Sequence, residues 1–283
     1  MADDTPASAD YAGWKLKIFI TVFLPIQVAA VLTRSYSQNL IGANFGIDCG
    51  LVLASLVSQF VIAGVSLGGV IQGAVGYHID FLERTNPDAI TLFFKYLVVF
   101  SVWYFATVSI AKGAICVLYS KLSPQRIVRV TIHIIIIVLI LTALSGAIAD
   151  LAACRPFSAN WGRAEVQKAH CMNKEALFIW ITLPNILTDV VLLLLPLPIV
   201  WNLQATRQLK AALTITFLFG SLGLIASIMR FVAFNRTDSF TDGTFHAVEL
   251  LIWTNAEPWD IPHFFLSIEI SAYLRQAQVR TRD

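Results

Sequence analysis

The sequence predicts an all-α, polytopic transmembrane helical bundle with seven helices, of which the seventh is defective. Three apolar stretches carry most of this prediction. Residues 132–149 contain no Asp, Glu, Lys or Arg, residues 176–203 contain Asp189 alone, and residues 211–234 contain Arg230 alone. Each stretch can cross a hydrocarbon core of about 30 Å, because about 20 residues suffice at helical rise.

The composition of the chain supports the same class of protein. Apolar residues make up 57% of the sequence and charged residues 13%. A soluble domain carries about 25% charged residues, so a water-soluble fold is excluded. The chain has 20 basic and 18 acidic residues, and this near-neutral balance leaves no basic stripe for nucleic acid. The expected partner is the lipid bilayer, with no nucleic acid.

Each predicted helix is an apolar run of spanning length between short connections. The leader, 1–13, is acidic and lacks the basic region and cleavage site of a signal peptide, so the first helix is expected to remain as an anchor. We expect one bundle over 14–270, a basic tail over 271–283, and neither a soluble domain nor an internal repeat. The predicted helices are 14–33, 47–70, 92–119, 127–149, 176–202, 211–234 and 248–270.

The seventh helix is the least suited to a membrane. Pro258, Asp260 and Pro262 place two prolines and a carboxylate within five residues. Each proline removes a backbone donor and kinks the helix axis. We therefore expect a kinked or partial helix after Glu257.

The positions of Lys and Arg predict the orientation of the bundle. Basic residues of loops near membrane helices collect on the cytoplasmic side. This rule places the N-terminus on the non-cytoplasmic side of a plasma membrane or endomembrane. The basic residues that it assigns to the cytoplasm are Arg34, Lys121, Arg126, Arg129, Arg207, Lys210, Arg275, Arg280 and Arg282.

Two cysteines bracket the one long loop of the predicted bundle. Under this orientation, Cys154 and Cys171 both lie in a non-cytoplasmic loop. Disulfides form in oxidising compartments, so we expect a disulfide between them rather than two free thiols. Cys49 and Cys116 fall inside predicted helices, where cysteine acts as a small packing residue.

Ionisable residues at membrane depth are costly and mark either function or a buried pair. Lys112, Asp189 and Arg230 are such residues, and Asn185 shares a helix face with Asp189 because the two are four positions apart. We expect Asp189 to face the interior and to meet Lys112 or Arg230. A structural ion pair is the simpler interpretation, and a pocket in which a ligand or a proton bridges these groups is the alternative.

An ordered series of short motifs runs from about Thr33 to Glu257. No single motif is specific, but in this order they resemble the fungal rhodopsin-like integral membrane proteins, a large group that includes receptor-like, seven-helix proteins and members encoded in secondary-metabolite clusters. Trp253 and Glu257 fit the last motif, and the resemblance ends there. The preceding motifs are Arg34-Ser35-Tyr36, Phe45-Gly46-Ile47-Asp48, Gly76-Tyr77-His78, Lys112 with Tyr119, Cys154-Arg155-Pro156 with Trp161 and Cys171, Asn185-Ile186-Leu187-Thr188-Asp189 with Pro196-Leu197-Pro198 and Trp201, and Gly220 with Ser227-Ile228-Met229-Arg230.

The resemblance implies a receptor-like or accessory membrane protein linked to a secondary-metabolite pathway, with a small lipophilic ligand or substrate. It does not imply light sensing, because residues 248–270 contain no lysine that could hold retinal. The five histidines show no metal-ligand spacing, so neither a metal nor another cofactor is expected.

An intramembrane enzyme is the alternative function, and a transporter comes third because no inverted repeat is visible. Asn185-x-x-x-Asp189 resembles half of the aspartate-rich motif of prenyl-transferring enzymes, although no second motif accompanies it. A cyclase needs one or two buried acids to protonate its substrate, and Asp189 with Glu249 or Glu257 could supply them. The sequence assigns no catalytic residue.

Overall fold

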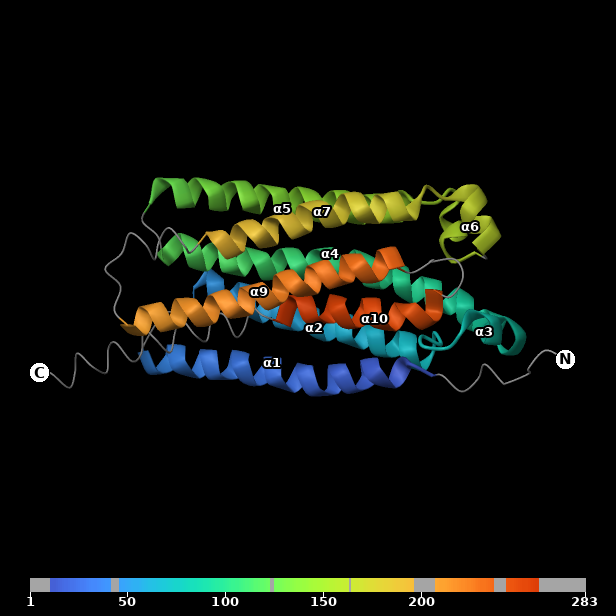
Figure 1. Ribbon diagram of the computed structural model, residues 1–283, viewed down its shortest axis with the longest axis horizontal. Helices are drawn as coiled ribbons and strands as arrows, with labels where there is room; N and C mark the ends of the chain where they lie inside the picture. The colour runs from blue at the N-terminus through green and yellow to red at the C-terminus, as the bar shows by residue number, and fades with distance from the viewer. Residues whose placement is uncertain are drawn as a thin grey trace, which may run out of the picture.

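A computed structural model describes residues 11–41, 46–122, 125–162, 164–195, 207–236 and 243–259. Most of the predicted leader and all of the predicted tail lie outside these ranges. Long helices run side by side along the bundle, and short ones cap one of its ends (Figure 1). The helices are α1 (Gly13–Ile41), α2 (Ile47–Ile71), α3 (Ile79–Thr85), α4 (Pro87–Leu122), α5 (Arg126–Ala152), η1 (Phe157–Trp161), α6 (Ala164–His170), α7 (Lys174–Leu194), α9 (Arg207–Arg236), α10 (Gly243–Ala256) and η2 (Glu257–Trp259).

Six of these helices are long and apolar enough to cross a membrane, which confirms the helical membrane bundle. The observed helix ends differ from the predicted ones by several residues. For example, α1 ends at Ile41, eight residues after the predicted end, because its polar last turns are still helical. The membrane-competent stretches among the described residues are Gly13–Asn39, Ile47–Ile71, Pro87–Ser120, Arg126–Ala152, Ala176–Leu194 and Phe217–Phe234.

The seventh predicted helix is not among these six. Where the sequence predicted 248–270, α10 begins earlier, at Gly243, has 14 residues and ends at Ala256. It passes into the 3₁₀ helix η2, which contains Pro258. A 3₁₀ turn is a common way for an α-helix to end. Residues 260–270 lie outside the described part of the chain.

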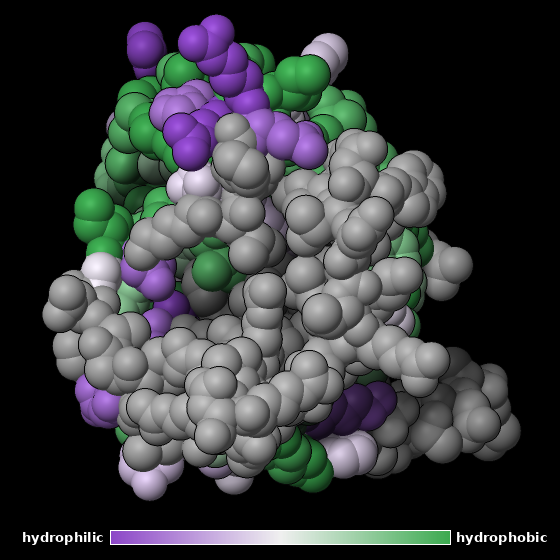
Figure 2. All heavy atoms as spheres, turned by 90° about the vertical axis from the view of Figure 1, so that its left-hand side faces the viewer, coloured by the Kyte–Doolittle hydropathy of each residue, from purple (hydrophilic) through white to green (hydrophobic). Residues whose placement is uncertain are grey.

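Helix α4 lies at the centre of the bundle. It packs against both α2 and α5, while α7 packs against α5 and α9, and α10 packs against α9 and α1. Apolar side chains on the flanks remain exposed, as at Leu32 and Ile148. Such residues suit a lipid-facing surface. The end view in Figure 2 shows hydrophobic side chains around the rim and hydrophilic ones over the start of α5, where Arg126 and Arg129 are exposed.

A tight turn that follows α2 contacts the starts of α1 and α10 at one end of the bundle. Gly76 has a φ of +99°, which a residue with a Cβ rarely adopts, and a Cβ here would overlap the backbone of Gly13. Its N–H donates to the carbonyl of Thr244 at 3.0 Å, and its carbonyl accepts from Ala12 N–H at 3.0 Å. The turn therefore holds the starts of α1 and α10 together.

The segment between α5 and α7 folds over the same end and is closed by the predicted disulfide. Cys154 and Cys171 form a disulfide bond. Beside it, a backbone hydrogen bond joins the two ends of the segment, because Met172 N–H donates to the carbonyl of Ala153 at 2.7 Å. Inside the segment, Gln167 Nε2 donates to the carbonyl of Gly162 at 2.9 Å. At the opposite end of the bundle, Arg34 Nη2 lies 3.2 Å from Asp48 Oδ2 and joins α1 to α2.

Candidate functional site: a buried polar cluster beside an apolar cavity

Four helical segments bring polar side chains to one place inside the bundle. On α4, Tyr104 and Lys112 are eight residues apart, so they share a face two turns apart. On α7, Asn185 and Asp189 share a face in the same way. The remaining members come from α9 and η2. We call the polar cluster the set Tyr104, Lys112, Asn185, Thr188, Asp189, Ser227, Arg230 and Glu257.

Lys112 is the centre of one half of the polar cluster. Its Nζ lies 2.7 Å from Asp189 Oδ1 and donates to Asn185 Oδ1 at 2.7 Å and to Thr188 Oγ1 at 3.3 Å. The other carboxylate oxygen of Asp189 accepts a hydrogen bond of 2.7 Å from the Ser227 hydroxyl. The ammonium group is therefore surrounded by oxygen atoms, and these contacts join α4, α7 and α9.

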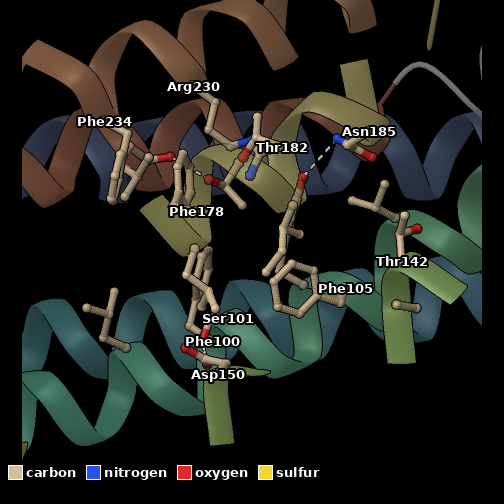
Figure 3. Close-up of a pocket in the computed structure, with 18 of the residues that line it drawn as sticks. Phe100, Ser101, Phe105, Thr142, Asp150, Phe178, Thr182, Asn185, Arg230 and Phe234 are labelled. Atoms are coloured by element: carbon tan, nitrogen blue, oxygen red, sulfur yellow. Dashed lines mark hydrogen bonds between the residues drawn. The ribbon is translucent and has the colours of Figure 1, made fainter. Parts of the chain in front are cut away.

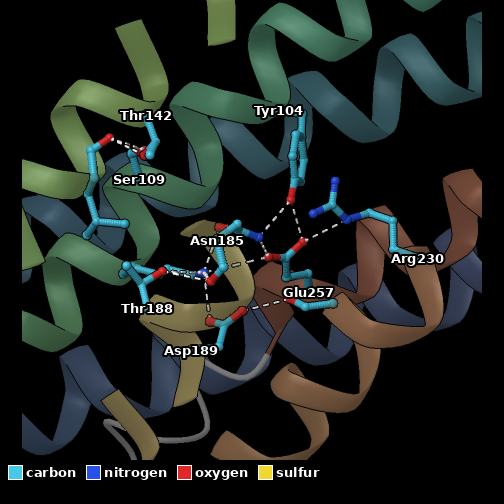
Figure 4. Close-up of polar contacts among 11 residues, drawn as sticks. Tyr104, Ser109, Thr142, Asn185, Thr188, Asp189, Arg230 and Glu257 are labelled. Atoms are coloured by element: carbon cyan, nitrogen blue, oxygen red, sulfur yellow. Dashed lines mark hydrogen bonds and ion pairs between the residues drawn. The ribbon is translucent and has the colours of Figure 1, made fainter. Parts of the chain in front are cut away.

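Glu257 is the centre of the other half. Its Oε1 accepts a hydrogen bond of 2.6 Å from Asn185 Nδ2, and its Oε2 accepts one of 2.6 Å from the Tyr104 hydroxyl. Two cations are farther away: Arg230 Nε is 3.5 Å from Oε2, and Lys112 Nζ is 3.8 Å from Oε1. Asn185 thus links the two halves, because it binds Lys112 through its oxygen and Glu257 through its nitrogen (Figure 4).

The charges of the polar cluster balance. Lys112 and Arg230 supply two positive charges, and Asp189 and Glu257 supply two negative charges. Removing a charge from water costs several kcal/mol unless it is paired and hydrogen-bonded. Lys112, Arg230 and Glu257 are each no more than 6% exposed. The mutual pairing therefore explains how four ionisable groups are accommodated inside an apolar bundle.

Arg230 differs from the other charged members in its surroundings. Its guanidinium carbon lies 4.6 Å from the centre of the Tyr104 ring and 5.5 Å from the centre of the Phe178 ring. Cation–π contacts of this kind stabilise a desolvated guanidinium. Among the described residues, Nε has no partner at hydrogen-bond geometry.

An apolar cavity of about 180 Å³ lies next to the polar cluster. By the same measure, one water molecule needs roughly 10–15 Å³, so there is room for a small organic molecule. Figure 3 shows phenylalanine rings from α4, α7 and α9 around the space. The lining residues are Leu97, Val98, Phe100, Ser101, Tyr104, Phe105, Val108, Ser109, Thr142, Ala143, Asp150, Lys174, Leu177, Phe178, Ile181, Thr182, Asn185, Arg230, Phe234, Leu250 and Thr254.

The cavity is elongated along the helices and has polar groups at both ends. The loop end, beside the disulfide-closed segment, carries Asp150 and Lys174; the inner end carries Asn185, Arg230 and Tyr104. From Lys174 to Asn185, α7 rises by about 16 Å at roughly 1.5 Å per residue. Burial lowers the pKa of Lys174, and the negative charge of Asp150 opposes this shift. Lys174 Nζ also donates to Gln167 Oε1 at 3.2 Å.

The polar cluster contains five of the six polar residues singled out from the sequence, namely Lys112, Asn185, Asp189, Arg230 and Glu257. Asp189 pairs with Lys112 and not with Arg230, whose acidic partner is Glu257. Glu249, considered above as a possible second acid, is exposed. Tyr104 was missed by the sequence analysis. Its position two helical turns before Lys112 was the available signal. Other aromatic residues surround Tyr104 on α4, so this spacing did not distinguish it from them.

The described residues contain no group of three or more His, Cys, Asp or Glu side chains that could hold a metal ion. Asp189 and Glu257 are the acids of the polar cluster, and their oxygens are engaged by Lys112, Ser227, Asn185 and Tyr104. The arrangement is thus suited to fixing helices and to offering donors at the inner end of the cavity.

Comparison with known proteins identifies the family of the chain. The model of the fungal rhodopsin domain matches residues 33–259. The "Polyenoic acids biosynthesis gene cluster protein Ba17b" of Metarhizium anisopliae is 48% identical over 267 residues, which are 91% of this chain and 73% of the relative. A "SAT4 family membrane protein" of Emericella nidulans is 25% identical over 166 residues, which are 58% of this chain and 43% of the relative. No solved structure shows a significant match. The chain therefore belongs to the fungal rhodopsin domain family.

Proposed function

We propose that this chain is a receptor-like or accessory membrane protein that binds a small lipophilic molecule of a secondary-metabolite pathway inside its bundle. The observation that carries the proposal is the cavity between α4, α5, α7, α9 and α10, with apolar walls and polar groups at both ends. Cavities of this character, with a few polar groups that orient the ligand, are the usual form of small-molecule sites. The bundle is oriented with its N-terminus on the non-cytoplasmic side, in line with its basic residues.

The relative from Metarhizium anisopliae supports the link to a pathway. Its name assigns it to a gene cluster for the biosynthesis of polyenoic acids, and it is 48% identical to this chain. A polyenoic acid is a lipophilic molecule that dissolves in membranes. A membrane-embedded binding site is a suitable place to sense or hold such a molecule.

An intramembrane cyclase that uses the acids considered above, Asp189 with Glu257, is a weaker candidate on geometric grounds. Acid catalysis requires a carboxyl group within hydrogen-bond reach of the substrate. Asp189 and Glu257 are turned toward Lys112 and toward Asn185 and Tyr104, respectively, and neither is among the described residues that line the cavity. Of the residues that line the inner end, Arg230 carries a buried Nε–H without a hydrogen-bond partner among the described residues, which suits the binding of an acceptor.

The test is a binding measurement on the full chain in phosphatidylcholine nanodiscs. The probe is parinaric acid, a fluorescent polyenoic acid that accepts excitation energy from nearby tryptophans. Ala143 lines the cavity, so Ala143→Phe should fill it and lower probe affinity about tenfold or more. Leu144 is 56% exposed on the outer side of α5, and Leu144→Phe is the matched control. Equal affinities for the two variants would contradict the proposal.

The pathway link needs a separate measurement in the fungus. The native gene is replaced by the Ala143→Phe or the Leu144→Phe version, and secondary metabolites are compared by mass spectrometry. We expect an altered metabolite profile in the Ala143→Phe strain relative to the Leu144→Phe strain. Identical profiles, with both proteins present at parental levels, would refute the link.

A further inference from the structure

The guanidinium of Arg230 includes one buried donor, Nε–H, that has no hydrogen-bond partner among the described residues. A guanidinium carries five N–H donors and no acceptor. Arg230 is 3% exposed, and within the described part of the chain its Nε has no partner at hydrogen-bond geometry. Buried donors without a partner are costly. An acceptor from outside the protein would therefore be stabilised at this point.

Glu257 is the acid beside Arg230, but it forms its short hydrogen bonds with other residues. The two oxygens of Glu257 accept short bonds of 2.6 Å from Asn185 and from Tyr104. Arg230 is left at 3.5 Å, a distance at which the charges attract but Nε is not hydrogen-bonded. Lys112, by contrast, has short contacts to Asp189 and Asn185. Within the described part of the chain, Nε of Arg230 is thus a buried donor of the polar cluster that remains without a hydrogen bond.

The side chain of Arg230 also borders the cavity. Arg230 is one of the residues that line it, together with Tyr104 and Phe178. The rings of these two residues lie 4.6 Å and 5.5 Å from the guanidinium carbon and limit its orientation. The N–H groups of a guanidinium lie in its plane and match the two oxygens of a carboxylate.

We propose that the cavity takes a lipophilic carboxylic acid whose carboxyl oxygens accept hydrogen bonds from Arg230, while its apolar chain extends toward the loop end. This inference rests on the proposed function and adds the chemical class and direction of the ligand. The hydrocarbon chain of the acid can lie along about 16 Å of α7, which is the helical rise between Asn185 and Lys174. Phe100 and Phe105 of α4 and Leu177 of α7 supply much of that wall.

The experiment is a competition on the native full chain in phosphatidylcholine nanodiscs with bound parinaric acid. Palmitic acid and hexadecane, which have equal chain lengths, are the competitors. Because charge-assisted hydrogen bonds favour the acid, palmitic acid should displace the probe at a concentration about tenfold lower than hexadecane. Displacement by both at the same concentration would overturn the inference.

A charge-neutral double variant locates the carboxyl group. Arg230→Gln with Glu257→Gln removes one positive and one negative charge together, so no lone charge is left buried. The preference for palmitic acid should fall from about tenfold to about onefold. Loss of the preference in Lys174→Gln but not in the double variant would put the carboxyl group at the loop end and overturn the inference.

The outcomes separate this inference from the proposed function. A native protein that does not bind parinaric acid, or Ala143→Phe and Leu144→Phe variants with equal affinities, would refute the function itself. Binding that Ala143→Phe abolishes, combined with equal displacement by acid and hydrocarbon, would refute only the role of Arg230. The competition uses the native protein, so it remains decisive if the double variant does not fold.

Discussion

Asn185 Nδ2 donates a hydrogen bond of 2.6 Å to Glu257 Oε1 and so ties the middle of α7 to the first residue of η2. Tyr104 of α4 holds the other carboxylate oxygen. The chain is least suited to spanning a membrane just after Glu257, where Pro258 and Pro262 occur. These polar contacts add to the apolar packing of Ala247, Val248 and Leu251 and so help to fasten α10 and η2 to the bundle.

The pair Lys112–Asp189 should contribute to stability as a unit. Asp189→Leu leaves the buried Lys112 without its closest acid, so we expect a loss of about 3–5 kcal/mol in the free energy of unfolding. Lys112→Met should be similarly harmful, and the double variant should lose less than the sum of the two. Thermal unfolding midpoints of the purified variants in detergent measure this. Additive losses within about 0.5 kcal/mol would show that the pair is not coupled.

The disulfide predicts a specific pattern of thiol labelling. Without reductant, the denatured protein should take up a thiol reagent at Cys49 and Cys116 alone, the two free cysteines. After reduction all four cysteines should react. Reduction should also lower the stability by about 3 kcal/mol, because the closed loop restricts the unfolded chain. A variant with Cys154→Ala and Cys171→Ala is the control and should not respond to reductant. Four labelled cysteines without reductant would disprove the bond.

Two glycines should respond differently to the same substitution. A Cβ at Gly146 of α5 would lie 3.1 Å from ring atoms of Phe105, whereas a Cβ at Gly113 of α4 would meet nothing within 4 Å. Gly146→Ala should therefore be less stable than Gly113→Ala by about 1 kcal/mol, because Phe105 must shift in a packed interface. Phe105 also lines the cavity, so parinaric acid affinity should fall in Gly146→Ala. Identical midpoints and affinities would contradict this account of the α4–α5 packing.

The orientation is tested by reporters that are active on one side of the membrane. A reporter before Met1 should be non-cytoplasmic, because the basic residues of the predicted loops favour that arrangement. A reporter after Asp283 then counts the crossings: a cytoplasmic signal corresponds to seven and a non-cytoplasmic signal to six. A cytoplasmic signal from the first fusion would show the orientation to be wrong.

The sequence by itself determined that this protein lies in a lipid bilayer, that it is helical and which two cysteines form the disulfide. The apolar run over 132–149 can be assigned without tertiary information, because transfer into hydrocarbon depends on composition and length. The same holds for the shared face of Asn185 and Asp189, which follows from the helical period. The short helices α3 and α6 were not predicted, since seven-residue helices leave little periodic signal.

Only the tertiary structure decided which charges meet and where the cavity lies. Lys112 and Arg230 were both candidates for Asp189, and helix packing brings Lys112 to it and Arg230 to Glu257. Tyr104 is part of the polar cluster because α4 lies against η2, which brings it to Glu257, a residue 153 positions away in the sequence. Pairing across a bundle depends on helix rotation and neighbour choice. Those are set by the sum of many packing contacts, so no local pattern in the sequence encodes them.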